Sequence, residues 1–208
     1  MGMTSLAYYL HEAGIVVEAF DDHFTEPCRT RMGEMGILIH SDSTTNANPD
    51  YVVRSSAVPE SSDEVRSWVN KGIPVYRRGD FLSRLLSEKK VLAVVGSHGK
   101  TSTTGMLAWA FKQVGFPCSH LIGGRFFQDQ FNPGQYVRSP WVLIEVDESD
   151  GSIDGFSPEI TLALNCDWDH VDQYQETDSF LNTLSGLFLR TKSHFICPQG
   201  SNIAGALT

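Results

Sequence analysis

The sequence predicts an α/β fold with mainly parallel sheets. One observation is that four helix-like stretches end in a glycine that passes at once into an apolar run. These glycines are Gly14, Gly36, Gly72 and Gly115. A glycine just past a helix end closes the last turn in the left-handed conformation, so each one indicates a passage from helix to strand. A second observation is that the apolar runs at 91–95, 141–146 and 160–164 have the length of buried strands. A third is that polar residues follow each run, as expected at the carboxyl ends of parallel strands.

We expect two units that pack against each other, a Rossmann-like domain over residues 1–88 and a P-loop-type nucleotide-binding domain over residues 89–208. No Pro/Ser-rich linker separates them. In the first unit we expect helices over about residues 4–13, after Pro27, from about residue 61 and over 79–90. Helical periodicity places Tyr9 and Trp68 on inward faces.

The second unit begins with the strand at 91–95 and continues with a helix after the glycine-rich turn. The strands at 141–146 and 160–164 follow, and then a helix over 179–190 leads to a strand at 195–197. The apolar residues of that last helix have helical spacing and are expected in the core: Phe180, Leu181, Leu184, Leu187 and Phe188.

A phosphate-binding turn is predicted directly behind the strand at 91–95. Its residues are Gly96, Ser97, His98, Gly99, Lys100, Thr101 and Ser102. Small residues let backbone N–H groups surround a polyphosphate, and the helix N-terminus adds its positive dipole end. Lys100 then supplies a charge for the outer phosphates, and the Thr101 hydroxyl a ligand for Mg²⁺. The pattern is a shortened Gly-x-x-Gly-Lys-Thr, so an ordinary glycine-rich turn remains the alternative.

Two further strand ends carry candidate ligands. The strand at 141–146 runs into an acidic cluster from which we select Glu148 as a magnesium ligand, with a solvated acidic turn as the alternative. The strand at 160–164 leads to Asn165 and then to Asp169 and His170. We expect His170 to bind a second cation, although a lone histidine is more often a surface or core group.

These three segments, 96–104, 145–150 and 165–174, resemble the Mur ligases in order and spacing, and within that family the branch that adds L-alanine to UDP-N-acetylmuramate. Segments 2–7, 55–58 and 73–78 resemble the family's UDP-sugar domain. Ser149 favours the alanine-adding branch, because the branch that recycles a tripeptide tends to have tyrosine there.

The resemblance implies an ATP-dependent amide ligase of peptidoglycan synthesis that uses Mg²⁺ and passes through an acyl phosphate. It implies that Lys100, Glu148 and His170 serve catalysis, and that Asn165 joins the nucleotide site. UDP-N-acetylmuramate would contact Ser55, Arg77, Arg78 and Arg125. It also implies that the family's first strand and the domain that receives the amino acid lie outside this chain, so we expect the isolated chain to be inactive.

Composition excludes several other classes. A formal net charge of −9 with no basic tract argues against binding nucleic acid. No apolar segment approaches the ~20 residues of a membrane span. The four cysteines have no C-x-x-C spacing, which indicates neither a zinc site nor a redox pair and fits a cytoplasmic location.

Two other hypotheses stay open. The first is a different ligase of the same superfamily, such as the tripeptide-recycling enzyme or a folylpolyglutamate-type synthase, and substrate-dependent phosphate release would separate these. The second is a nucleotide-binding module without catalysis, which would bind MgATP but ligate nothing.

Overall fold

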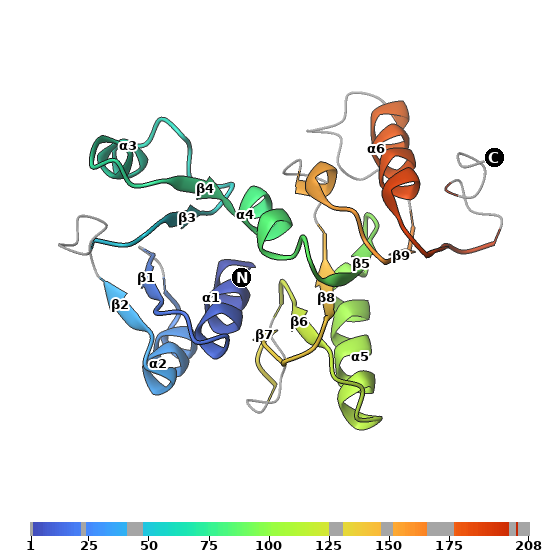
Figure 1. The fold of residues 1–208 in the computed structure, drawn as a ribbon, viewed down its shortest axis with the longest axis horizontal. Coiled ribbons are helices and arrows are strands. Elements are labelled where there is room, and N and C mark those ends of the chain that lie inside the picture. The colour runs from blue at the N-terminus through green and yellow to red at the C-terminus, as the bar shows by residue number, and fades with distance from the viewer. Residues whose placement is uncertain are drawn as a thin grey trace.

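The structure is a computed structural model that describes residues 2–21, 24–40, 48–124, 131–146, 152–165, 177–199 and 203. Helices and strands alternate along the chain, as Figure 1 shows. The helices are α1 (Gly2–Glu12), α2 (Glu26–Met35), α3 (Asp63–Asn70), α4 (Arg78–Leu85), α5 (Lys100–Gln113) and α6 (Thr177–Arg190), with a 3₁₀ turn, η1 (Ser152–Gly155). The strands are β1 (Glu18–Phe20), β2 (Leu38–His40), β3 (Val52–Arg54), β4 (Val75–Arg77), β5 (Lys90–Val95), β6 (Ser119–Leu121), β7 (Gly134–Gln135), β8 (Trp141–Glu145), β9 (Ile160–Ala163) and β10 (His194–Ile196).

The α/β architecture with mainly parallel strands is confirmed. The largest sheet has the order β10-β9-β5-β8-β6-β7, and only the β6–β7 pair is antiparallel. In the first unit β1 pairs with β2 and β3 with β4, both in parallel. The predicted glycines close the helices: Gly14, Gly36, Gly72 and Gly115 have φ of 86°, 83°, 76° and 69°.

Helices cover both faces of the largest sheet (Figure 1). On one face, Val94 of β5 packs with Ala108 of α5. On the other, Val95 packs in one cluster with Leu184 of α6, and α1 and α4 contribute Leu6 and Leu82 to that same cluster. The first and second units therefore share a continuous core, which agrees with the expectation that they pack together. The boundary between residues 88 and 89 stays a prediction.

Several details differ from the sequence-based expectations. The first strand starts at Glu18, a few residues after the apolar run at 15–17. Trp68 is only half-buried, because Val65 takes the inward position on α3 and the ammonium of Lys71 lies 4.4 Å from the Trp68 ring. On α6, Leu184 and Leu187 are buried as predicted, but Phe188 is 36% exposed. Phe180 and Leu181 lie among the residues whose side chains are not described.

Within the described ranges no helix combines the length and apolar character needed to cross a membrane.

Candidate nucleotide and sugar-nucleotide site

The glycine-rich turn joins β5 to α5 at the carboxyl end of the central strand. Gly96 has φ of 139°, and a Cβ there would lie 3.1 Å from the backbone N and O of Asn165. Gly99 has φ of 79° and occupies the N-cap of α5. Both conformations are ones that residues with a side chain rarely adopt. The two glycines thus let the backbone curl tightly into the first turn of a helix, which is the geometry of a phosphate-binding loop.

Asn165, just beyond the end of the neighbouring strand β9, holds this loop. Its Oδ1 accepts a hydrogen bond of 2.9 Å from the backbone N–H of His98, and its Nδ2 donates one of 3.0 Å to the His98 carbonyl. The Asn165 carbonyl also accepts a 3.4 Å bond from the Ser97 N–H. The sequence predicted Asn165 as a residue of the nucleotide site, and in the structure its side chain hydrogen-bonds the backbone of the loop.

Lys100 and Thr101 lie in the first turn of α5. The ammonium of Lys100 donates a 2.7 Å hydrogen bond to the carbonyl of Gly96, so it lies over the loop itself. Thr101 and Ser102 are exposed, and Thr104 is buried with its hydroxyl donating to the Lys100 carbonyl at 2.8 Å. The Lys100 charge and the Thr101 and Ser102 hydroxyls therefore lie at the N-terminal end of α5, directly after the loop.

Glu145, the last residue of β8, is a candidate site residue that the sequence alone did not indicate. In the register of β5 and β8 it lies opposite Val94, next to the start of the loop. Burial raises the pKa of the Glu145 carboxyl above its ordinary value, while a hydrogen bond from Thr101 and the charges of Arg78 and Lys100 act in the opposite direction. Its Oε2 atom is buried and has no hydrogen-bond partner.

A buried carboxylate oxygen with no partner costs free energy, and a bound cation removes that cost. Thr101 and Glu145 together offer a hydroxyl and a carboxylate, the hard oxygen ligands that Mg²⁺ prefers. The residues present therefore fit a magnesium ion whose remaining ligands come from phosphates and water. The sequence feature that could have indicated Glu145 is that it is the single acidic residue in the otherwise apolar run at 141–146.

Room for the Glu145 side chain depends on the glycine pair that follows β6. A Cβ at Gly123 would collide with Oε1 of Glu145, and a Cβ at Gly124 would collide with the Thr101 side chain. The Gly123 backbone also hydrogen-bonds the Glu145 carboxylate. These contacts explain two glycines at a position where neither has a positive φ.

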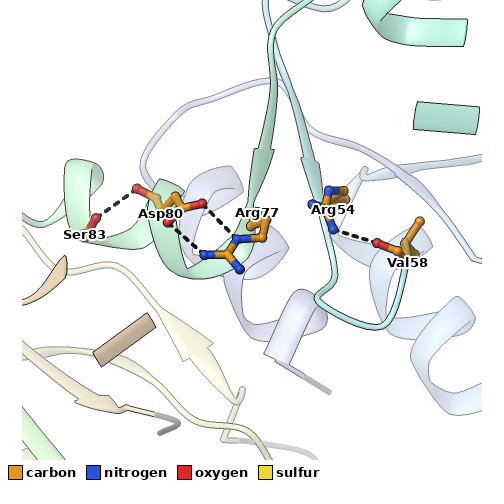
Figure 2. A network of polar contacts seen from close by, with 5 residues as sticks. All are labelled: Arg54, Val58, Arg77, Asp80 and Ser83. Atoms are coloured by element: carbon orange, nitrogen blue, oxygen red, sulfur yellow. Dashed lines mark hydrogen bonds and ion pairs between the residues drawn. The ribbon is translucent and has the colours of Figure 1, made fainter. Parts of the chain in front are cut away.

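The first unit brings its own candidate residues to one edge. The register pairs Arg54 of β3 with Arg77 of β4, and Figure 2 shows both at the ends of these strands. Arg77 forms an exposed ion pair with Asp80 at 3.0 Å, and Arg54 donates to the Val58 carbonyl at 2.6 Å. The Ser55 hydroxyl accepts the N–H of Ala57 at 3.2 Å.

Arg78 connects this edge to the second unit. It is the first residue of α4, and its guanidinium packs against the start of α1, where a Cβ at Gly2 would lie 2.8 Å from Cζ. Its Nε atom is buried without a hydrogen-bond partner. The Arg78 charge also acts on Glu145 across the boundary between the units.

Three predicted site residues, Arg125, Glu148 and His170, lie outside the described residues, as does Asp169. Within the described part, no group of three or more His, Cys, Asp or Glu side chains could hold a metal ion by itself.

Known proteins resemble the chain in both sequence and structure, although no protein-family model matches it. The UDP-N-acetylmuramate–L-alanine ligase of Syntrophomonas wolfei is 35% identical over 181 residues, covering 86% of this chain and 38% of the relative. That of Geotalea uraniireducens is 33% identical and covers 98% of this chain and 45% of the relative. Among solved structures, the UDP-N-acetylmuramate:L-alanyl-γ-D-glutamyl-meso-diaminopimelate ligase of Neisseria meningitides has a TM-score of 0.86 at 25% identity and covers 99% of this chain and 70% of that one. The chain is therefore similar to Mur ligases over nearly all of its length.

The chain spans less than half the length of the curated relatives that it matches. The UDP-N-acetylmuramate–alanine ligase of Thermotoga maritima shares the fold, with a TM-score of 0.86 at 24% identity over 99% of this chain and 48% of that one. The similarity to Mur ligases thus concerns part of each of these proteins.

Proposed function

We propose that the chain forms the part of an ATP-dependent ligase that binds MgATP and UDP-N-acetylmuramate, for the addition of L-alanine in peptidoglycan synthesis. One observation carries the proposal. A phosphate-binding loop, a partnerless carboxylate oxygen of Glu145 and the Arg78 guanidinium of the first unit converge at one edge of the central sheet. The curated relatives carry this activity in their names.

The nucleotide would lie along the loop, with backbone N–H groups and the N-terminus of α5 facing the phosphates. Lys100 would move its ammonium from the Gly96 carbonyl to the outer phosphates. Asn165 keeps the loop in shape through its paired bonds to His98. Ser102 adds a hydroxyl in the exposed first turn of the helix.

Magnesium would be held by Thr101 and Glu145, and it would neutralise phosphate charge during transfer. Glu148 and His170 remain predicted ligands on the segments that follow β8 and β9. Glu145 is the stronger candidate of the two glutamates, because its buried Oε2 lacks a partner and its carboxylate shares a hydrogen bond with Thr101.

The sugar nucleotide would lie at the edge formed by β3 and β4. Its diphosphate needs positive charge, which the start of α1 and the guanidinium of Arg78 supply together. Ser55, Arg77 and Arg125 are the other proposed contacts. Because Arg77 is exposed and paired with Asp80, it would exchange that ion pair for the ligand.

The chemistry would be activation of a carboxylate. The lactyl carboxylate of UDP-N-acetylmuramate attacks the γ-phosphorus of ATP, which gives an acyl phosphate and releases ADP. The amine of L-alanine then attacks the acyl carbon, an amide bond forms and inorganic phosphate leaves. The protein needs no covalent nucleophile, since positioning and charge neutralisation suffice. The reaction would take place in the cytoplasm, where these small molecules are made.

Calorimetric titration tests the proposal directly. We expect the chain to bind an ATP analogue in the presence of Mg²⁺, and Glu145→Gln to lose most of the Mg²⁺-dependent gain in affinity. Glu159→Gln is the matched control, because Glu159 precedes the first residue of β9, at the end of that strand opposite to the glycine-rich loop. The proposal is contradicted if the analogue binds with equal affinity with and without Mg²⁺, or does not bind at all.

Ligation of a tripeptide is the second candidate activity, favoured by the fold match to the Neisseria ligase. Phosphate release in the presence of UDP-N-acetylmuramate and either L-alanine or the tripeptide distinguishes the two. We expect the isolated chain to release none with either acceptor, and a protein that includes the remainder of the relatives' length to respond to L-alanine.

A further inference from the structure

Arg78 is held at the boundary between the two proposed substrate sites. It begins α4 at the end of β4, and its guanidinium packs against the first residue of α1, where a Cβ added to Gly2 would lie only 2.9 Å from Nε and 3.1 Å from Nη2. This contact fixes the guanidinium where the proposed diphosphate would bind. Burial of Nε without a partner leaves one strong donor unsatisfied in the ligand-free chain.

Glu145 has the complementary deficit on the other side of the boundary. Its Oε2 is buried without a partner, at the end of β8 where the proposed metal would bind. No direct ion pair joins Glu145 to Arg78 in the described structure, but the Arg78 charge acts on the carboxylate. Two groups of opposite charge, each with one buried atom that lacks a hydrogen-bond partner, therefore interact electrostatically across the two units.

We propose that Arg78 couples the two sites, so that MgATP and the sugar nucleotide each strengthen the binding of the other. This inference rests on the proposed function. It adds a specific role for Arg78, which sequence analysis placed only among the sugar-nucleotide contacts.

The coupling follows from charge balance. Without ligands, the carboxylate of Glu145 attracts the positively charged guanidinium of Arg78. This attraction weakens the binding of an anion by the guanidinium at α1. A divalent cation at Glu145 takes over the carboxylate's charge and repels the guanidinium toward the diphosphate. A diphosphate that neutralises Arg78 removes the repulsion felt by the cation. Each ligand thus favours the other, as linkage requires.

Lys100 does not provide the same connection. Its ammonium also acts on Glu145, but it hydrogen-bonds the Gly96 carbonyl inside the nucleotide loop. Arg78 is the group of this set that touches the first unit's helix α1. Removing the Arg78 charge should therefore abolish the coupling between the two sites while leaving the nucleotide loop intact.

The test is a pair of calorimetric titrations on the full chain. UDP-N-acetylmuramate is titrated with and without a saturating mixture of Mg²⁺ and a non-hydrolysable ATP analogue. For the unmodified chain we expect Kd for the sugar nucleotide to fall by about fivefold or more when the nucleotide is present. In Arg78→Gln we expect Kd to rise overall and the ratio of the two Kd values to fall to within about twofold of one.

Two further variants make the result specific. Arg78→Lys keeps the charge and should keep a ratio clearly above that of Arg78→Gln. Arg84→Gln removes one charge from the same helix, where the guanidinium lies 5.0 Å from the Tyr76 ring, and should keep the full ratio. Circular dichroism and thermal unfolding establish that each variant is folded. If Arg78→Gln does not fold, the comparison of Arg78→Lys with the unmodified chain decides, and a ratio below about twofold for Arg78→Lys overturns the inference.

The outcomes separate the inference from the function on which it rests. If both ligands bind and the ratio is one in the unmodified chain, or if the ratio survives in Arg78→Gln, the coupling role of Arg78 is overturned and the proposed function stands. If neither ligand binds the unmodified chain, the proposed function fails and the inference fails with it.

Discussion

Removal of the Asn165 side chain tests whether the loop geometry controls nucleotide affinity. The Asn165→Ala substitution deletes the 2.9 Å and 3.0 Å hydrogen bonds to the His98 backbone. Each such bond contributes about 0.5–1.5 kcal/mol net, so the ordered loop loses about 1–3 kcal/mol. Asn165 is half-buried, which places the loss in the lower half of that range. Because ~1.4 kcal/mol corresponds to a factor of ten, we expect Kd for MgATP to rise about tenfold.

Titration of a fluorescent ATP analogue measures the change, with thermal unfolding in parallel. The Asn70→Ala variant removes the same side chain from an exposed position at the end of α3 and should bind like the unmodified chain. Asn165→Asp keeps the acceptor for the His98 N–H but replaces the donor with a charge beside the phosphates, so it should bind at least as weakly as the alanine variant. Unchanged nucleotide affinity in a folded Asn165→Ala protein would refute the reasoning.

Three further predictions follow from backbone geometry and burial. Gly96→Ala should lower the free energy of unfolding in urea by about 1–3 kcal/mol, because the Gly96 φ of 139° is strained for alanine. Gly33→Ala within α2 is the control: a Cβ there meets no heavy atom within 4 Å, so this variant should raise the free energy of unfolding by about 0.5–1 kcal/mol. Burial, with a smaller contribution from Tyr136, raises the pKa of Tyr9 from 10.0 to about 12, so the stability that this group contributes is complete below pH 10 and is lost as the pH rises through 12. The unfolding free energy of Tyr9→Phe should fall less steeply over that interval, and equal slopes would contradict the assignment. Burial also raises the pKa of the Cys118 thiol to about 11, so mass spectrometry should find it alkylated by iodoacetamide at pH 8 far more slowly in the folded chain than in urea.

Local chemistry made much of the fold predictable. The helix-ending glycines are sequence-local devices, so Gly14, Gly36 and Gly72 marked their joints correctly. The short strand β3 was missed because it has only two apolar residues before Arg54. Strand β7 has two residues and exists through its antiparallel pairing with β6, which no local pattern announces.

Candidate site residues could be proposed from the sequence where they follow one another along the chain, and not where strands bring them together. The proposed phosphate loop needs one segment, and its glycines Gly96 and Gly99 both have positive φ. Glu145 reaches Thr101 only because β8 is the neighbour of β5, with Glu145 opposite Val94. The sequence does not state that order of strands, so Glu145 was not among the predicted ligands, and Glu148 of the acidic cluster stays a prediction. The contact between Arg78 and Gly2 likewise depends on how α1 and α4 pack.

The core that the two units share has a practical consequence. Leu6 of α1 and Leu82 of α4 are each 2% exposed, and they pack in the same cluster as Val95 of the central strand. A cut in the chain before β5 would expose a large apolar surface on both halves. The halves would therefore tend to aggregate when expressed apart. Crystallographers or screeners who wish to trim this protein should therefore keep both halves on one polypeptide and expect a single melting transition.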